Sequence, residues 1–364
     1  MTLRIGFVGC GGMGKQHLRI LRELDQFKVV ALSDVSTDAL AACGEEFGVA
    51  DHFSDCGQMC DAVRPDLVVV ATQTRHHHGP SLAALERGIH VLCEKPMAID
   101  PVEADDMVAA ATASGANLSI NQQNHVNPAV RRAREMIDAG DIGEVVLVRG
   151  RNKHGRKSGN EFTEMGTHVT DIMLVVGGMP NWVAGTVMWE GRHVIPGDIM
   201  EAQQMSPKDR DSGPVAGERA IAHYGFEAGH LGEIHFLGYE ALQGTNYGVD
   251  VLGTEGQLAI RVSGEMAGGL WHLPRAMEGT PADLGDWAAV DLGENAQGKT
   301  VATMYQAVAA AIAGDGPVPA SGEQGRMAME MVLGIYASHK EGGQRVDLPL
   351  ADRRHPLDAW RSEG

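Results

Sequence analysis

The sequence lacks a basic surplus, long apolar runs and many aromatic side chains. Acidic residues outnumber basic ones by 48 to 30 among 364 residues, which gives a formal net charge of −18. Because nucleic acids and anionic membranes bind basic surfaces, we expect neither as a partner. No apolar run reaches the roughly 18 residues that span a bilayer. The first strand pattern begins within residues 1–5, which leaves no room for a signal peptide.

Cysteine is also scarce, and its spacing is not that of a metal site. The five cysteines are odd in number, fall in the first quarter of the chain and lack the CxxC spacing of zinc sites. They are Cys10, Cys43, Cys56, Cys60 and Cys93. Reduced thiols in a cytoplasmic protein are the simplest interpretation.

Glycine, by contrast, is abundant at 47 residues, and three glycines form a phosphate-binding pattern. Gly9-x-Gly11-x-x-Gly14 follows a strand pattern and precedes a helical one. The first glycine permits a tight turn, the second lets the backbone approach a pyrophosphate, and the third lets the helix pack on the strand. The helix N-terminus offers free N–H groups to phosphates. The alternative interpretation is an ordinary glycine-rich turn.

Asp34 favours the dinucleotide interpretation. It ends a second strand pattern, residues 29–33, and lies 20 residues past Gly14. At this place a carboxylate accepts a hydrogen bond from a ribose 2′-hydroxyl and repels a 2′-phosphate. Residues 35–42 contain no Arg or Lys to bind that phosphate. The pattern therefore predicts NAD in preference to NADP.

Strand and helix patterns alternate from residue 3 to about residue 121. Further strands are expected at residues 67–71, 90–93 and 118–120, and helices at residues 38–47 and 101–114, the latter capped by Asp100. This alternation predicts a doubly wound parallel sheet. Three consecutive histidines, residues 76–78, cannot easily converge on one ion, so we expect no metal there.

Glu94-Lys95-Pro96 follows directly after one of these predicted strands. A lysine after a strand is usually a solvated surface charge. Ligands of doubly wound sheets, however, bind at the carboxyl ends of the strands, and Pro96 restrains the backbone of Lys95. Lys95 is therefore a candidate site residue.

The second half of the chain has a different pattern. Short strands separated by glycine-rich turns predict an antiparallel sheet, at residues 145–150, 183–188, 219–226, 231–237, 247–253 and 257–262. Helices are expected at residues 304–313 and 325–340. The polar residues 189–218 are too long for an ordinary connection and indicate a lid or a subunit-contact arm.

Glu164, His168 and Asp171 have helical spacing, which places all three on one face. On this pattern alone, the favoured interpretation is a core histidine paired with a neighbouring carboxylate.

Taken with the glycine pattern, Glu94-Lys95-Pro96 resembles the Gfo/Idh/MocA oxidoreductases, which include sugar and cyclitol dehydrogenases. Ala71-Thr72, His77 and residues 131–145 and 343–350 extend the resemblance over nearly the whole chain. The resemblance implies an α/β protein. A Rossmann domain at residues 1–122 would precede an α+β substrate-binding and oligomerisation domain with an open, mainly antiparallel sheet at residues 123–364, and a C-terminal helix would pack back on the Rossmann domain. It also implies a homo-oligomer, a dimer or tetramer, formed through the C-terminal sheet.

The resemblance also implies catalytic roles. Relatives carry an Asp-x-x-x-His pair at the place of Glu164 and His168, with His as the acid/base group. Glu164 stands where Asp is usual and would orient His168 or a substrate hydroxyl. Lys95 would hydrogen-bond the reacting oxygen, and Asp171 would at most support His168.

The family pattern implies two further sets of contacts. The cofactor contacts would be Gly9, Gly11, Gly12, Met13, Gly14, Asp34, Thr72, His77, Glu94, Lys95 and Gln123. The substrate contacts would be Lys95, Asn124, His154, Arg156, Glu164 and His168, whose side chains suit a polyhydroxylated substrate. His125 stands where the family often has Arg, so the pattern departs from the family at this point.

The sequence is compatible with three functions. The first is an NAD-dependent dehydrogenase that oxidises a secondary hydroxyl of a sugar, cyclitol or related polyol, or reduces the ketone. The second is an enzyme that retains NAD and cleaves or rearranges a glycosidic bond by transient oxidation. The third is a non-enzymatic NAD-linked regulator, against which the acid/base set Lys95, Glu164 and His168 counts.

Overall fold

A computed structural model describes residues 2–153, 155, 157–205, 210–239, 247–262, 269–275, 286–293 and 300–363. The chain forms two compact units. The first consists of Met1–Gln123 and Lys299–Arg326, and the second of Asn124–Gly298 and Met327–Gly364. The division falls within helix α10 (Gly322–Lys340).

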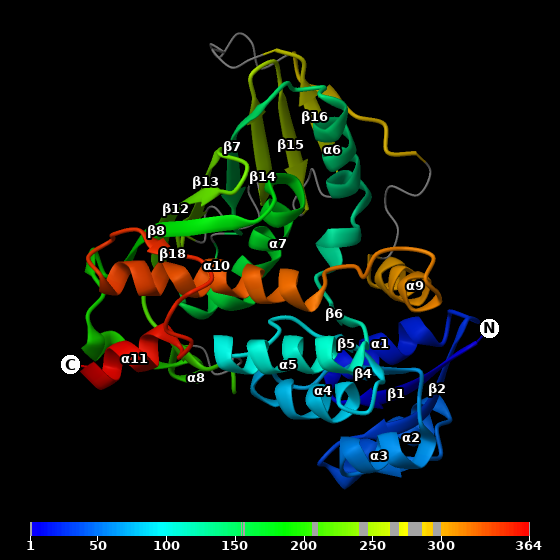
Figure 1. Cartoon of the computed structure of the whole chain (residues 1–364). Coiled ribbons are helices and arrows are strands. Elements are labelled where there is room, and N and C mark those ends of the chain that lie inside the picture. Colours follow the sequence, from blue (N-terminus) through cyan, green and yellow to red (C-terminus); the bar gives the residue numbers. More distant parts are fainter. Residues whose placement is uncertain are drawn as a thin grey trace. The chain divides into compact units, whose positions relative to one another are not determined.

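The first unit is built on a six-stranded parallel sheet with the order β3-β2-β1-β4-β5-β6 (Figure 1). Its strands are β1 (Leu3–Val8), β2 (Phe27–Ser33), β3 (His52–Phe53), β4 (Leu67–Val70), β5 (His90–Cys93) and β6 (Leu118–Ile120). Strand β4 and residues 5–8 of β1 are buried, as expected for a parallel sheet covered on both faces. The strand order is that of a doubly wound dinucleotide-binding fold, which confirms the predicted fold class.

Three helices of the first unit, α2, α3 and α5, begin next to a residue whose side chain caps them. Its helices are α1 (Gly12–Leu21), α2 (Thr37–Phe47), α3 (Cys56–Val63), α4 (His78–Leu85), α5 (Pro101–Ser114) and α9 (Thr300–Ala313). The carboxylate of Asp100 accepts a hydrogen bond from the Glu103 N–H, which confirms the predicted cap of α5. All five cysteines are buried free thiols.

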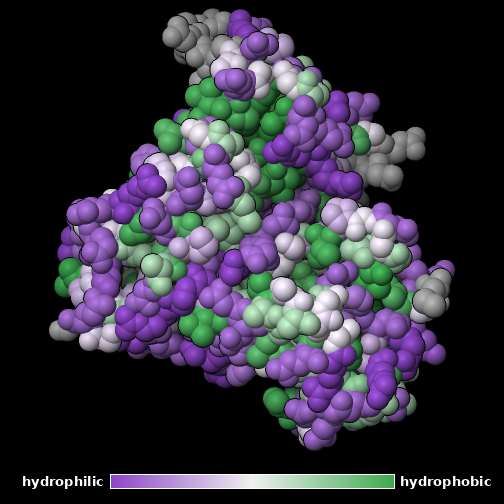
Figure 2. All heavy atoms as spheres, viewed as in Figure 1, coloured by the Kyte–Doolittle hydropathy of each residue, from purple (hydrophilic) through white to green (hydrophobic). Residues whose placement is uncertain are grey.

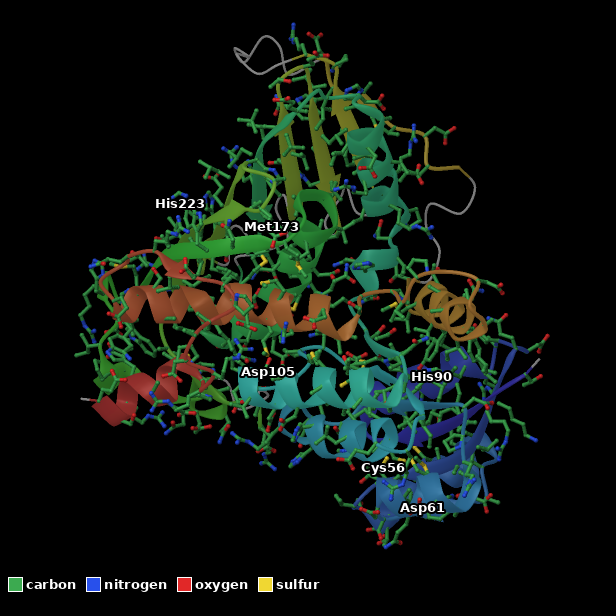
Figure 3. All side chains as sticks on the ribbon, viewed as in Figure 1. Cys56, Asp61, His90, Asp105, Met173 and His223 are labelled. Atoms are coloured by element: carbon green, nitrogen blue, oxygen red, sulfur yellow. The ribbon has the colours of Figure 1, made fainter. Side chains whose placement is uncertain are left out.

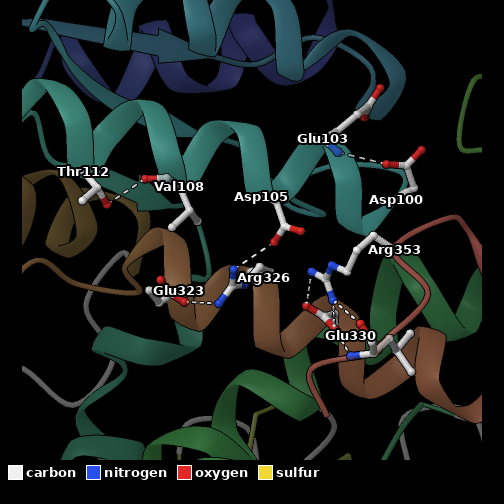
Figure 4. Close-up of polar contacts among 10 residues, drawn as sticks. Asp100, Glu103, Asp105, Val108, Thr112, Glu323, Arg326, Glu330 and Arg353 are labelled. Carbon is white, nitrogen blue, oxygen red and sulfur yellow. Dashed lines mark hydrogen bonds and ion pairs between the residues drawn. The ribbon is translucent and has the colours of Figure 1, made fainter. Parts of the chain in front are cut away.

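Residues from the far end of the chain complete the first unit. The Ile120 N–H donates to the Ala320 carbonyl at 2.9 Å, and Ser119 forms an isolated bridge with Ser321. Figure 4 shows that Arg326 reaches Asp105 on α5, an ion pair of 2.9 Å. The first unit is therefore closed by residues 299–326 as well as by its own sheet.

The second unit is built on a mixed sheet of ten described strands, β17-β16-β15-β14-β7-β13-β12-β8-β18, with β9 beside β8. Its strands are β7 (Val145–Arg151), β8 (Pro180–Trp189), β9 (Arg192–His193), β12 (Arg219–Phe226), β13 (Leu231–Phe236), β14 (Gly248–Gly253), β15 (Gln257–Arg261), β16 (Gly269–Leu273), β17 (Ala288–Ala289) and β18 (Val346–Asp347). Most neighbours are antiparallel and one pair, β13 and β7, is parallel, which confirms the predicted mainly antiparallel sheet. Spacing along the chain does not reveal pairing between strands that are far apart in sequence.

The helices of the second unit include α6 (Pro128–Ala139), α7 (Gly166–Gly177), α11 (Pro356–Glu363) and most of α10. Helix α7 packs on β7 and β14, and nearly all of its residues are buried. A side chain at Gly150 would lie 2.7 Å from Met173 Sδ, so this glycine permits the close approach of helix and sheet (Figure 3). The sheet and α7 thus form the core of this unit.

Residues 189–218, interpreted from sequence as one polar arm, contain short regular elements. These are β9, a 3₁₀ turn (Pro196–Asp198), β10 (Met200–Glu201), α8 (Ala202–Met205) and β11 (Pro214–Val215), with residues 206–209 outside the described part.

Within the described residues, each helix is too short or too polar to traverse a bilayer. Figure 2 shows that hydrophilic residues predominate on the visible face.

Candidate active site

The glycine loop joins β1 to α1 with the geometry expected from its sequence. Gly9 has φ +102°, and a Cβ at this position would lie 2.5 Å from the Ala71 carbonyl oxygen. A Cβ on Gly14 would lie 1.9 Å from the Gly9 oxygen, whereas one on Gly11 would meet no described atom within 4 Å. Gly9 and Gly14 are therefore required by the fold, while Gly11 leaves space for a ligand.

Asp34 is tied to this loop. Its Oδ2 accepts a hydrogen bond from the Cys10 N–H at 2.7 Å, and its Oδ1 accepts one from the Ser36 N–H at 2.8 Å. Two backbone donors thus fix the orientation of the carboxylate beside the glycine turn. Each oxygen retains a lone pair for a further donor such as a ribose hydroxyl.

A cavity of about 860 Å³ lies over the loop and the carboxyl ends of β1, β2 and β4. Of the predicted cofactor contacts, it is lined by Gly9, Gly11, Gly12, Met13, Asp34 and Thr72. A ribose acceptor, an open glycine and the N-terminus of α1 meet in one space, so these residues fit a dinucleotide.

Other residues that line the cavity were not among the predicted contacts. Arg75 and Asp55 face this cavity together with Cys56, which begins α3 and is labelled in Figure 3. Asp55 also caps α3 by accepting from the Gln58 N–H. Cap and turn residues are common in all loops, so their position beside the cavity could not be inferred from sequence.

The remaining predicted cofactor contacts do not line this cavity. Gly14 packs under the loop, and Gln123 accepts a hydrogen bond from Thr300 at 2.6 Å. His77 is buried, with its ring nitrogens 2.9 Å from the Pro96 oxygen and 3.2 Å from the Thr72 oxygen. His77 therefore connects the loop after β4 to the turn that contains Lys95.

Glu94 is the centre of a buried hydrogen-bond network. Its Oε1 lies 2.7 Å from His17 Nε2 and 2.5 Å from Asn121 Nδ2, and its Oε2 accepts from the Lys95 N–H at 3.1 Å. His17 Nδ1 lies 2.7 Å from the hydroxyl of Tyr305 on α9. Burial raises the pKa of Glu94, but His17, Asn121 and Lys95 outweigh it and bring the pKa to about 2.

This network holds the backbone at Lys95, which is half-buried. His17 and Tyr305 were not singled out from sequence, although His17 stands three residues past Gly14 on the buried side of α1. A polar residue on the apolar face of a helix is the signal that points to His17. No local pattern points to Tyr305, because its partner lies 288 positions away.

Alanine at Gly9 and at Gly11 should separate folding from cofactor binding. Gly9→Ala forces a left-handed backbone and a clash, so we expect a loss of about 1–3 kcal/mol in the free energy of unfolding. Gly11→Ala should leave unfolding unchanged and weaken NADH binding, because its methyl group enters the cavity. Urea unfolding and NADH fluorescence titration measure the two effects. Equal unfolding curves for Gly9→Ala and wild type would contradict this assignment.

In the second unit, the helix predicted to carry three site residues is divided. Glu164 lies in a π-helical turn (Glu161–Met165), whereas His168 and Asp171 lie on α7. The placement of all three residues on one regular α-helical face was therefore wrong for Glu164. A Cβ on Gly166 would lie 2.7 Å from the Phe236 ring, and this close packing sits at the junction of the two helical forms.

His168 is 7% exposed and Asp171 is fully buried. His125 Nδ1 lies 3.2 Å from Asp171 Oδ1, so His125 is paired with a residue of α7. Burial raises the pKa of Asp171, and the hydrogen bond and charge of His125 lower it in part. Glu164 and Asn124 are half-buried, and His154 and Arg156 lie outside the described residues.

Residues 3–122 match the model of GFO_IDH_MocA, described as an oxidoreductase family with an NAD-binding Rossmann fold. The N-terminal domain belongs to the Gfo/Idh/MocA oxidoreductase family. The match covers the sheet, the glycine loop and Glu94-Lys95-Pro96, and it confirms the resemblance predicted from these residues.

The curated relatives are sugar and cyclitol dehydrogenases. D-apiose dehydrogenase of Paraburkholderia graminis is 31% identical over 37% of this chain and 36% of its own length. D-glucoside 3-dehydrogenase of Escherichia coli is 29% identical over 49% and 55%, and myo-inositol 2-dehydrogenase of Thermotoga maritima is 24% identical over 70% and 74%. The chain thus spans between a third and just over half of the length of the first two of these relatives.

Solved structures extend the fold similarity over nearly the whole chain. Levoglucosan dehydrogenase in complex with NADH and levoglucosan has a TM-score of 0.77 at 22% identity and covers 96% of this chain and 100% of its own. The WlbA dehydrogenase of Bordetella pertussis, in complex with NADH and UDP-GlcNAcA, has a TM-score of 0.75 at 22% identity over 96% and 98%. At this identity the similarity establishes the fold of both units.

Proposed function

We propose that the chain is an NAD-dependent dehydrogenase that oxidises a secondary hydroxyl of a sugar, cyclitol or related polyol, or reduces the corresponding ketone. The cavity over the glycine loop carries the proposal, because it joins open glycine backbone to the oriented Asp34 carboxylate in an NAD-binding family domain. The names of the curated relatives support the class of substrate.

In this proposal, residues of the chain accept the hydroxyl proton and stabilise the charge on the reacting oxygen. Bound NAD supplies the acceptor for the hydride. His168 takes the hydroxyl proton, since an unperturbed imidazole titrates near neutrality. Lys95 hydrogen-bonds the reacting oxygen and stabilises its developing negative charge. Glu164 orients His168 or a substrate hydroxyl, and Asn124, His154 and Arg156 contact the substrate.

A panel of sugars, inositols and sugar acids tests this function. With NAD, steady growth of NADH absorbance on one compound would support the proposal. Product formation without net NADH would instead favour an enzyme that retains NAD and rearranges its substrate by transient oxidation. Absence of either on every compound, together with tight NADH binding, would favour a regulator.

We expect NADH to bind at least about tenfold more tightly than NADPH, which corresponds to about 1.4 kcal/mol. The Asp34 carboxylate, fixed by Cys10 and Ser36, accepts from a 2′-hydroxyl and repels a 2′-phosphate. Asp34→Asn should reduce this ratio, and Asp38→Ala, which removes an exposed carboxylate on α2, should not. Fluorescence titration with both cofactors measures the ratio. An equal or tighter dissociation constant for NADPH would overturn the preference.

We further propose a cytoplasmic homo-oligomer formed through the C-terminal sheet. Ile221 is paired with His235, and Leu231 lies on the same side of β13 as His235, so these two exposed apolar side chains share one face of the sheet. A charged residue at either position should shift the oligomer toward monomer in analytical ultracentrifugation. An unchanged sedimentation coefficient would contradict this interface.

A further inference from the structure

A buried acid/base residue needs a route by which its proton reaches solvent. His168 is 7% exposed, and a bound substrate would cover the side from which it receives the proton. Alcohol oxidation breaks the C–H and O–H bonds and releases one proton for each NADH formed. That proton must leave His168 before the next turnover.

Asp171 lies one helical turn beyond His168 on α7. Residues at this spacing have Cβ atoms about 5–6 Å apart on one helix face. The Asp171 side chain is fully buried, and its Oδ2 has no hydrogen-bond partner among the described residues. A buried acceptor of this kind is normally satisfied by a neighbouring donor or by an ordered water.

The other oxygen of Asp171 leads toward the surface. Oδ1 lies 3.2 Å from His125 Nδ1, and the His125 side chain is 18% exposed against 1% for Asp171. Because burial raises the pKa of Asp171, its carboxyl takes up a proton more readily than an exposed aspartate does. The exposed part of the His125 imidazole can then exchange that proton with solvent.

We propose that Asp171 and His125 form a proton relay that carries the substrate's hydroxyl proton from His168 to solvent. The relay rests on the proposed dehydrogenase function and extends it. During oxidation, the proton passes from His168 to Asp171, directly or through one water. With its own proton on Nε2, His125 accepts the proton from Asp171 at Nδ1 and releases the Nε2 proton to solvent, and rotation of the ring restores the starting tautomer. No electron moves in the relay, and reduction of a ketone would use it in the opposite direction.

Variants at His125 separate a relay from an ion pair that only supports the fold. His125→Arg keeps a positive partner for Asp171 but cannot pass a proton at neutral pH. His125→Ala removes the relay and opens a space that imidazole can enter. For both variants we expect kcat to fall by about 10- to 100-fold, which is less than the roughly 10²- to 10⁴-fold of a group that transfers the proton at the reacting atom, with KM nearly unchanged. Imidazole buffer should restore turnover to His125→Ala, and His223→Ala, an exposed histidine on β12, should behave as wild type.

A second readout follows the proton itself. In stopped flow with a pH indicator, proton release should accompany NADH formation in wild type and lag behind it in His125→Arg. Wild-type kcat in His125→Arg, or no rescue of an impaired, folded His125→Ala by imidazole, would overturn the relay. If His125→Ala does not fold, as judged by circular dichroism, the comparison between wild type and His125→Arg decides. A wild type that forms no NADH with any polyol would overturn the proposed function, and the relay with it.

Discussion

Alanine in place of His168 or of Lys95 should lower turnover on the true substrate by about 10²- to 10⁴-fold. This is the usual contribution of a positioned group that transfers a proton or stabilises charge at the reacting atom. In the proposed mechanism, loss of His168 removes the buried acceptor of the hydroxyl proton. Without Lys95, the developing alkoxide loses a cationic hydrogen-bond donor. Steady-state kinetics measure both losses.

Two matched variants control for general effects of these substitutions. Lys28→Ala removes an exposed lysine from β2, and His223→Ala removes an exposed histidine from β12, which is labelled in Figure 3. Both should retain wild-type turnover. NADH affinity, measured separately, distinguishes loss of chemistry from loss of cofactor. Near wild-type turnover in both His168→Ala and Lys95→Ala would show that the acid/base assignment is wrong.

Glu330→Ala should destabilise the second unit by about 3–5 kcal/mol, the cost of removing one partner from a buried ion pair. Glu330 on α10 is fully buried, and its two oxygens accept from Arg353 Nη1 and Nη2 at 2.7 and 2.8 Å (Figure 4). It also accepts from the Leu350 N–H at 2.7 Å. The substitution removes the carboxylate that accepts hydrogen bonds from the Arg353 guanidinium and from the Leu350 N–H. Such a loss is a large share of the 5–15 kcal/mol typical of a domain.

Glu323 provides a control on the same helix. Glu323 forms an ion pair with Arg326 on α10, but its side chain is 53% exposed. Glu323→Ala should therefore change the free energy of unfolding by less than about 1 kcal/mol. Urea unfolding followed by circular dichroism compares the two variants. Equal midpoints for Glu330→Ala and Glu323→Ala would contradict a stabilising role of the buried pair.

The architecture of the first unit is readable from sequence because local signals agree with one another. Strands β5 and β6 begin and end at the predicted residues, and Asp100 caps α5 as its sequence indicates. Continuous apolar runs have one stable location, a sheet buried on both faces. The glycine loop was also predictable, because each of its three glycines meets a separate steric requirement.

Features that depend on distant packing were not readable. The parallel pairing of β13 with β7 and the π-helical turn at Glu164 both depend on how the sheet meets α7. Likewise, the family resemblance implies a cofactor contact for Glu94, but it does not reveal that the carboxylate bonds to His17 and Asn121. A side chain's partners are set by the fold, and residue type alone leaves them open.

The contribution of Tyr305 and Ala320 to the first unit has a consequence for biosynthesis. When Gln123 has been added to the growing chain, His17 still lacks the Tyr305 hydroxyl, and Ile120 lacks the Ala320 carbonyl. Residues 124–298 must be translated first, which takes roughly ten to thirty-five seconds at the usual rates of about 5–20 residues per second. For that interval the nascent dinucleotide domain exposes surfaces that α9 later covers. A ribosome that stalls within residues 124–298 therefore holds a Rossmann sheet without its final helix.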